Sequence, residues 1–164
     1  KRYSIFLKHL KFNDKKILDY GTGVGSFYSF LVKKKILVKK YNALEINDNL
    51  IKYLKKKFKK NFYVTSNRKY FLKNKVDISI SNGVHNFNSG KKEKYFYNEI
   101  KYLYNISKEA VGISFLNENV DYKENYLSYK NLQKIIKYLE VNKFKYILDQ
   151  TFNKYETFLF IFKN

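Results

Sequence analysis

The chain has 164 residues and a formal net charge of +20, with 45% hydrophobic residues and neither Cys nor Met. The length suits one domain, and the apolar content is enough for a buried core, which argues against a disordered chain. The absence of Cys excludes disulfides, thiolate metal sites and a Cys nucleophile. No apolar run approaches the roughly 18 residues of a membrane span, so we expect a soluble, cytoplasmic protein.

The positive charge comes almost entirely from lysine. Of the 34 basic residues, only Arg2 and Arg68 are Arg. A surface that reads phosphates or bases usually includes Arg, whose planar fork binds them bidentately. We therefore attribute most of the charge to an AT-rich coding bias, and nucleic acid stays an alternative, less favoured partner.

Helical and extended patterns alternate along the chain. In chain order we expect a helix over 2–10, a strand over 16–19, a helix over 26–34, a strand over 41–46, a helix over 49–60, strands over 61–64 and 77–81, a helix over 93–105, a strand over 111–115, a helix over 128–140, and strands over 144–148 and 156–162. This order predicts an α/β fold: a Rossmann-like, doubly wound and mostly parallel seven-stranded sheet.

The last two expected strands have no helix between them, which indicates an antiparallel C-terminal hairpin at one edge of the sheet. No linker or repeat divides the chain, so we interpret residues 1–164 as one catalytic domain. Because the chain begins at Lys1 without Met, we expect some N-terminal residues to be missing.

One glycine-rich stretch, ILDYGTGVGSF at 17–27, joins the first strand to the next helix. Glycines let a ligand approach the backbone, and the helix that follows offers free N–H groups. The dinucleotide fingerprint G-x-G-x-x-G fits poorly, because Ser26 occupies its third glycine position and Asp19 would lie against a pyrophosphate. The spacing here is G-x-G-x-G.

This stretch resembles the first motif of class I S-adenosylmethionine-dependent methyltransferases, apolar-apolar-acidic-x-Gly-x-Gly-x-Gly, which LDYGTGVG at 18–25 matches position for position. Two further segments fit the same family. ALEIN places Glu45 at the end of the second strand, and DISISNGVHNF at 77–87 resembles the family's fourth-strand segment. The segment 114–129 also resembles small uncharacterised members of this superfamily.

The resemblance implies a role for each matching residue. Glu45 would hold the ribose hydroxyls, Ile46 would pack on the adenine, and Ser81 would lie with its neighbours by the methionine end. Asn67 stands near the position where relatives carry an Asp for the adenine amino group. The full implied set of S-adenosylmethionine contacts is Asp19, Gly21, Thr22, Gly23, Gly25, Glu45, Ile46, Asn67, Ser81, Asn82 and Gly83.

The acceptor side is harder to read. His85 is the only histidine near the expected site, and a base with a pKa near neutrality would suit a hydroxyl or amine acceptor, although a lone His is often incidental. No metal-binding, P-loop or Ser/His/Asp pattern is present. Most of the 17 Tyr and 15 Phe fall on apolar stripes, so we interpret them as core residues.

The resemblance implies an enzyme that transfers the methyl group of S-adenosylmethionine to an unidentified acceptor and leaves S-adenosylhomocysteine. We expect a small-molecule acceptor, because SNGV at 81–84 resembles small-molecule members of the family. Two alternatives stay open. One is an RNA- or protein-directed methyltransferase that uses the basic surface. The other is a methyltransferase-like module that binds cofactor or partner without catalysis.

Overall fold

The computed structural model describes residues 1–88, 90 and 93–163. Its strands are β1 (Lys16–Tyr20), β2 (Lys40–Leu44), β3 (Phe62–Thr65), β4 (Val76–Asn82), β5 (Ser107–Asn117), β6 (Tyr129–Lys130), β7 (Lys145–Asp149) and β8 (Glu156–Phe162). Its helices are α1 (Arg2–His9), α2 (Ser26–Lys33), α3 (Asp48–Lys57), α4 (Tyr70–Lys73), the 3-10 turn η1 (Val84–Asn86), α5 (Lys94–Ile106) and α6 (Leu132–Val141).

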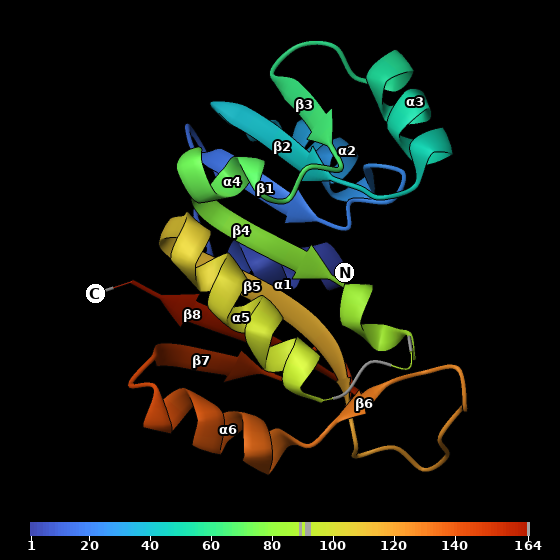
Figure 1. Cartoon of the computed structure of the whole chain (residues 1–164), viewed down its shortest axis with the longest axis vertical. Helices are drawn as coiled ribbons and strands as arrows, with labels where there is room; N and C mark the ends of the chain where they lie inside the picture. Colours follow the sequence, from blue (N-terminus) through green and yellow to red (C-terminus); the bar gives the residue numbers. More distant parts are fainter. Residues whose placement is uncertain (89, 91–92, 164) are drawn as a thin grey trace.

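The strands form one sheet in the order β3-β2-β1-β4-β5-β8-β7, and the short β6 pairs with the end of β5 (Figure 1). Strands β1 to β5 run parallel, whereas β8 runs antiparallel to both β5 and β7. The predicted α/β sheet and its C-terminal hairpin are therefore confirmed. The strand order reverses between β1 and β4, which is where open α/β sheets bind ligands.

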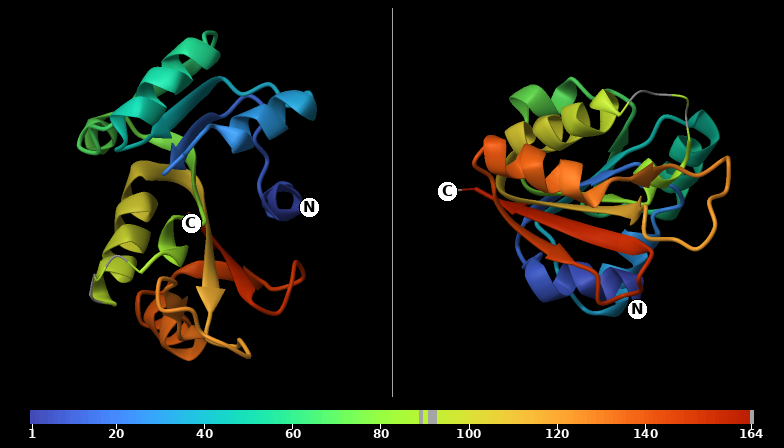
Figure 2. Two further views of the ribbon diagram at one scale, coloured as in Figure 1. Left: turned by 90° about the vertical axis from the view of Figure 1, so that its right-hand side faces the viewer. Right: turned by 90° about the horizontal axis from the view of Figure 1, so that it is seen from below.

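Helices cover both faces of the sheet (Figure 2). Phe6 of α1 and Leu54 of α3 belong to one buried cluster, together with Ile17 of β1. Leu18, the next residue of β1, belongs to a second cluster with Ile100 of α5. Neighbouring residues of β1 thus point into opposite cores, as expected for a central parallel strand buried on both sides.

The helix expected over 128–140 begins later than predicted, at Leu132. Tyr129 and Lys130 instead extend the sheet as β6, and the side chain of Asn131 caps the helix by accepting the N–H of Lys134 at 3.0 Å. Long-range pairing with β5 overrides the local helical pattern here. In the described part of the chain, no helix is long and apolar enough to cross a bilayer.

Helix α1 is fixed to the far edge of the sheet by a buried carboxylate. Asp149, at the end of β7, accepts hydrogen bonds from His9 Nε2 at 2.7 Å and Lys8 Nζ at 2.8 Å. Its other oxygen accepts the N–H and hydroxyl of Thr151. Burial by itself would raise the pKa of Asp149, but these hydrogen bonds hold it below its ordinary value.

We expect Asp149→Asn to lower the free energy of unfolding at pH 7 by about 1–3 kcal/mol, because it removes charge-assisted bonds to a buried group. Since the native pKa is lowered, this stabilisation is present above the ordinary pKa and is lost as the pH falls below it. Urea unfolding at pH 7 measures the loss. Asp121→Asn is the control, because Asp121 is exposed and pairs with Lys154 and Tyr155 at the surface; equal effects of the two variants would contradict the assignment.

Candidate functional site

The three glycines of the loop between β1 and α2 share a positive φ but differ in the space around them. Gly21, Gly23 and Gly25 all have positive φ, at 72°, 58° and 74°, a region that non-glycine residues rarely adopt. A Cβ on Gly21 would lie 2.3 Å from Val84, and one on Gly25 would lie 2.5 Å from Phe58. A Cβ on Gly23 would meet no atom within 4 Å, so this glycine alone borders open space.

Asp19 lies beneath this loop, inside the protein. It is buried, and its carboxylate accepts the hydroxyls of Thr22 and Tyr41. Burial raises the pKa of Asp19 to about 6, and the two hydrogen bonds oppose that rise. Asp19 and Thr22 therefore shape the loop from inside the protein, and neither lines the cavity described below.

Glu45, directly after β2, joins the loops that follow the first two strands. One carboxylate oxygen accepts the N–H of Gly23 at 3.0 Å, and the other accepts those of Ile46 at 2.8 Å and Asn47 at 3.0 Å. An ionised carboxylate has about four acceptor positions. Three are used here, so one is left for a further donor.

A cavity of about 610 Å³ opens beside these loops, within the size range of small-molecule sites. Its lining comes from the carboxyl ends of β1, β2 and β3, from the turn after β4, from the start of α5 and from β6. The lining residues are Tyr20, Gly21, Leu44, Glu45, Ile46, Ser66, Arg68, Val84, His85, Phe87, Asn88, Tyr95, Phe96, Ser128 and Lys130.

Four of the predicted site residues border this cavity: Gly21, Glu45, Ile46 and His85. Ile46 is 85% exposed, which is unusual for an isoleucine and leaves an apolar side chain uncovered at the cavity. Asn67 does not line the cavity, although its neighbours Ser66 and Arg68 do. Its N–H instead donates to the hydroxyl of Thr65.

The predicted trio at the end of β4 supports the cavity without lining it. Ser81 is fully buried, and its hydroxyl has no hydrogen-bond partner among the described residues. Ser114 Oγ donates to Asn82 Oδ1 at 3.1 Å and accepts the N–H of Gly83 at 3.0 Å. Gly83 has a φ of 78° and lies against the guanidinium of Arg2, which pairs with Glu156.

His85 is buried in the turn that follows Gly83. Its ring stands edge-on to Phe96, with centroids 5.0 Å apart, and lies nearly parallel to Tyr20 at 6.5 Å. The two aromatic neighbours fix the plane of the imidazole at the cavity wall. Asn86 has a structural role, since its Oδ1 accepts the N–H of Leu116.

An ion pair next to the cavity was not predicted from the sequence. Arg68 pairs with the buried Glu99 of α5 at 2.6 Å, and its guanidinium lies 3.7 Å from the ring centroid of Tyr102. Burial, together with the Glu99 carboxylate, raises the pKa of Tyr20 above its ordinary value. The sequence feature that could have indicated this ion pair is Glu99, an acidic residue on the apolar face that Phe96, Ile100 and Leu103 form on the helix.

Asp19→Asn tests the buried carboxyl beneath the loop. Because the native pKa of Asp19 is raised from 3.8 to about 6, this group favours folding at low pH and loses that contribution as the pH rises through about 6. Asn keeps an acceptor for Thr22 and Tyr41 and carries no charge. We expect the stability of the variant relative to the parent to rise between pH 4 and 7 by on the order of 2–3 kcal/mol.

Urea unfolding of both proteins across this pH range measures the difference. A difference that is the same at pH 4 and pH 7 would contradict the raised pKa. Asp121→Asn again serves as the control, because the pKa of Asp121 is lowered by its hydrogen bond from Lys154 and not raised.

Comparison with known proteins adds to this geometry. No protein-family model matches the chain, and no curated protein matches it at a significant level. Among solved structures, it superposes over 99% of its length on 80% of the magnesium protoporphyrin IX methyltransferase of Synechocystis PCC 6803 with bound S-adenosylhomocysteine, at a TM-score of 0.72 and 14% identity.

Two further structures are similar. A SAM-dependent methyltransferase from Aquifex aeolicus superposes on 99% of this chain over 89% of its own length, at a TM-score of 0.66 and 16% identity. A putative RNA methyltransferase from Pyrococcus horikoshii superposes on 98% of this chain over 80% of its own length, at a TM-score of 0.67 and 18% identity. The chain has the fold of the class I S-adenosylmethionine-dependent methyltransferases.

Proposed function

We propose that this protein binds S-adenosylmethionine and transfers its methyl group to a small-molecule acceptor. The observation that carries the proposal is the position of Glu45 at the wall of the cavity, tied to Gly23 by a hydrogen bond. A carboxylate at the cavity wall, bonded to a glycine with open space beside it, suits a ligand that has hydroxyl donors and contacts the backbone.

The residues present fit this cofactor at three points. The one acceptor position left on Glu45 suits a ribose hydroxyl. The open space beside Gly23 admits the ligand against the loop. The exposed side chain of Ile46 offers an apolar surface on which an adenine ring packs.

The cofactor supplies an activated methyl group on its sulfonium. The protein therefore has to position the acceptor and exclude water, and acid–base chemistry is needed only when the acceptor carries a proton. His85, held between Tyr20 and Phe96 at the cavity wall, is the residue we propose for removing that proton.

The alternative RNA-directed function rests on the lysine surface. Lys55, Lys56 and Lys57 end α3 on the exposed side of the helix. RNA binding through such residues would weaken steeply with salt. We favour a small molecule because the cavity walls are largely aromatic and apolar, whereas the lysines of α3 do not line it.

Gly23→Ala tests cofactor binding. We expect it to weaken S-adenosylhomocysteine binding at least about tenfold, because the new methyl group occupies space that the ligand needs. Titration calorimetry measures the affinity. Gly90→Ala is the matched control, since Gly90 also has positive φ and its Cβ also meets nothing within 4 Å; it should leave the affinity unchanged. Absence of binding to the parent protein would refute the cofactor assignment.

His85→Gln tests the proton acceptor. We expect methyl transfer from labelled S-adenosylmethionine into cell extract to fall about 10²-fold, while S-adenosylhomocysteine affinity stays the same. A variant that transfers as fast as the parent would show that His85 is not the base. A blank transfer assay for the parent, with cofactor bound, would instead support the non-catalytic alternative.

A further inference from the structure

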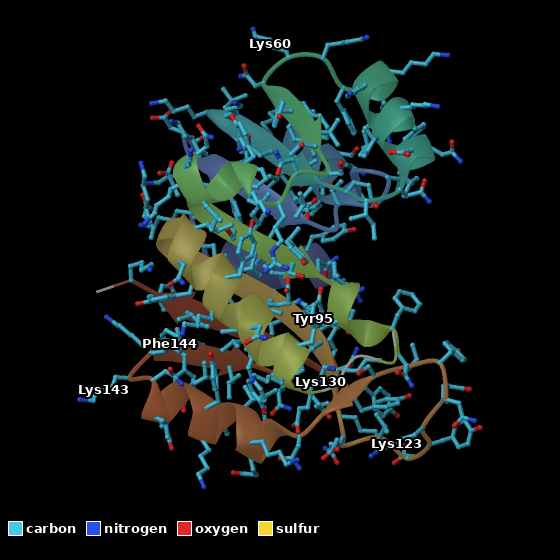
Figure 3. The ribbon with its side chains drawn as sticks, in the orientation of Figure 1. Lys60, Tyr95, Lys123, Lys130, Lys143 and Phe144 are labelled. Atoms are coloured by element: carbon cyan, nitrogen blue, oxygen red, sulfur yellow. The ribbon has the colours of Figure 1, made fainter. Side chains whose placement is uncertain are left out.

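The part of the cavity lined by η1, α5 and β6, which we call its acceptor half, contains a lysine that differs from the many lysines on the surface. Lys130 lies on β6, where it pairs in register with Asn117 of β5, and it lines the same cavity as Glu45. Figure 3 labels Lys130 and Tyr95, both beside the N-terminal end of α5. Among the described lining residues, Lys130 and Arg68 carry permanent or near-permanent positive charge.

These two cations differ in whether a carboxylate pairs with them. Arg68 is paired with the buried carboxylate of Glu99. Within the described part of the chain, Lys130 has no carboxylate within 4.0 Å. The field of Glu93 reaches it, but Glu93 pairs with Lys134 at 3.2 Å.

The contacts of Lys130 leave part of its ammonium group available. It donates to Ser128 Oγ at 2.7 Å and lies 5.3 Å from the ring centroid of Phe96. An ammonium has three donors, so two are not accounted for by these contacts. Burial also lowers the pKa of Lys130, as expected for a cation partly removed from water without an anion beside it.

The cavity that Lys130 lines is rich in aromatic side chains. Tyr20, His85, Phe87, Tyr95 and Phe96 all line the cavity. Phe87 is 67% exposed, so its ring is open to a ligand. Aromatic rings pack against one another in offset or edge-on geometry with a gain beyond simple burial.

We propose that the acceptor is a small aromatic molecule carrying a carboxylate or phosphate, and that Lys130 binds this anionic group. The inference rests on the proposed function for the identity of the cavity as an acceptor site. It adds the class of acceptor: aromatic walls hold the ring, and the lysine on β6 fixes its charged end.

Ligand-observed NMR with phenyl phosphate, benzoate, inorganic phosphate and benzyl alcohol tests this without methyl transfer. We expect the two aromatic anions to bind in the millimolar range or tighter, and inorganic phosphate and benzyl alcohol to bind more weakly. A preference for phenyl phosphate over benzoate identifies phosphate as the anionic group, and the reverse identifies carboxylate. Equal binding of benzyl alcohol and the aromatic anions would overturn the proposal.

Lys130→Met should weaken binding of the preferred aromatic anion about tenfold, equivalent to about 1.4 kcal/mol, and Lys130→Arg should restore most of it. The matched control is Lys123→Met. Lys123 also lies over an aromatic ring, that of Tyr129, but it is outside the cavity lining. An unchanged affinity in Lys130→Met would refute the role of Lys130; should that variant fail to fold, Lys130→Gln provides the same test.

Two outcomes separate this inference from the function on which it rests. If the parent protein binds the aromatic anion but not S-adenosylhomocysteine, the cofactor proposal is refuted and the anion site is still supported. Normal S-adenosylhomocysteine binding without any aromatic anion binding would refute the anion site alone. Binding of a single-stranded RNA oligonucleotide that depends on Lys130, in the absence of binding to the small anions, would also overturn the small-molecule assignment.

Discussion

The hydrogen bonds that Glu45 accepts from the backbone determine the geometry of the site. Gly23 belongs to the loop after β1, and Ile46 and Asn47 belong to the turn after β2, so one carboxylate connects two loops. The parallel pairing of β1 and β2 brings Tyr20 beside Leu44 and places both loops at the same edge of the sheet. The relative position of the two loops is therefore fixed by strand pairing and by the hydrogen bonds of Glu45.

Two acidic residues near the glycine loop have different roles because their surroundings differ. Asp19 faces the core, where two hydroxyls satisfy it and burial raises its pKa. Glu45 faces the cavity and is satisfied by backbone N–H groups. Asp19 therefore supports the loop from inside the protein, whereas Glu45 keeps one acceptor position directed to the cavity.

Much of the fold could be predicted from the sequence because it depends on local patterns. Alternating strands and helices indicated the parallel sheet, and the glycine spacing located the turn at its switch point. The motif also pointed to Glu45 and Ile46, which do line the cavity. Asp19, Ser81 and Asn82 do not line the cavity, because a motif records which residues recur together and not which side chains face a cavity.

The part of the cavity lined by η1, α5 and β6 was not predictable for a physical reason. Its lining comes from segments far apart in sequence, and Tyr129 and Lys130 became a strand only through pairing with β5. The net charge of the chain offered no help either. A solvated lysine on α3 and a partly buried lysine in the cavity contribute equally to a charge count. The first is stabilised by water, whereas the second has lost part of its hydration and has no paired carboxylate among the described residues. Location, which only tertiary structure supplies, turns one lysine among many into a candidate for recognising an anion.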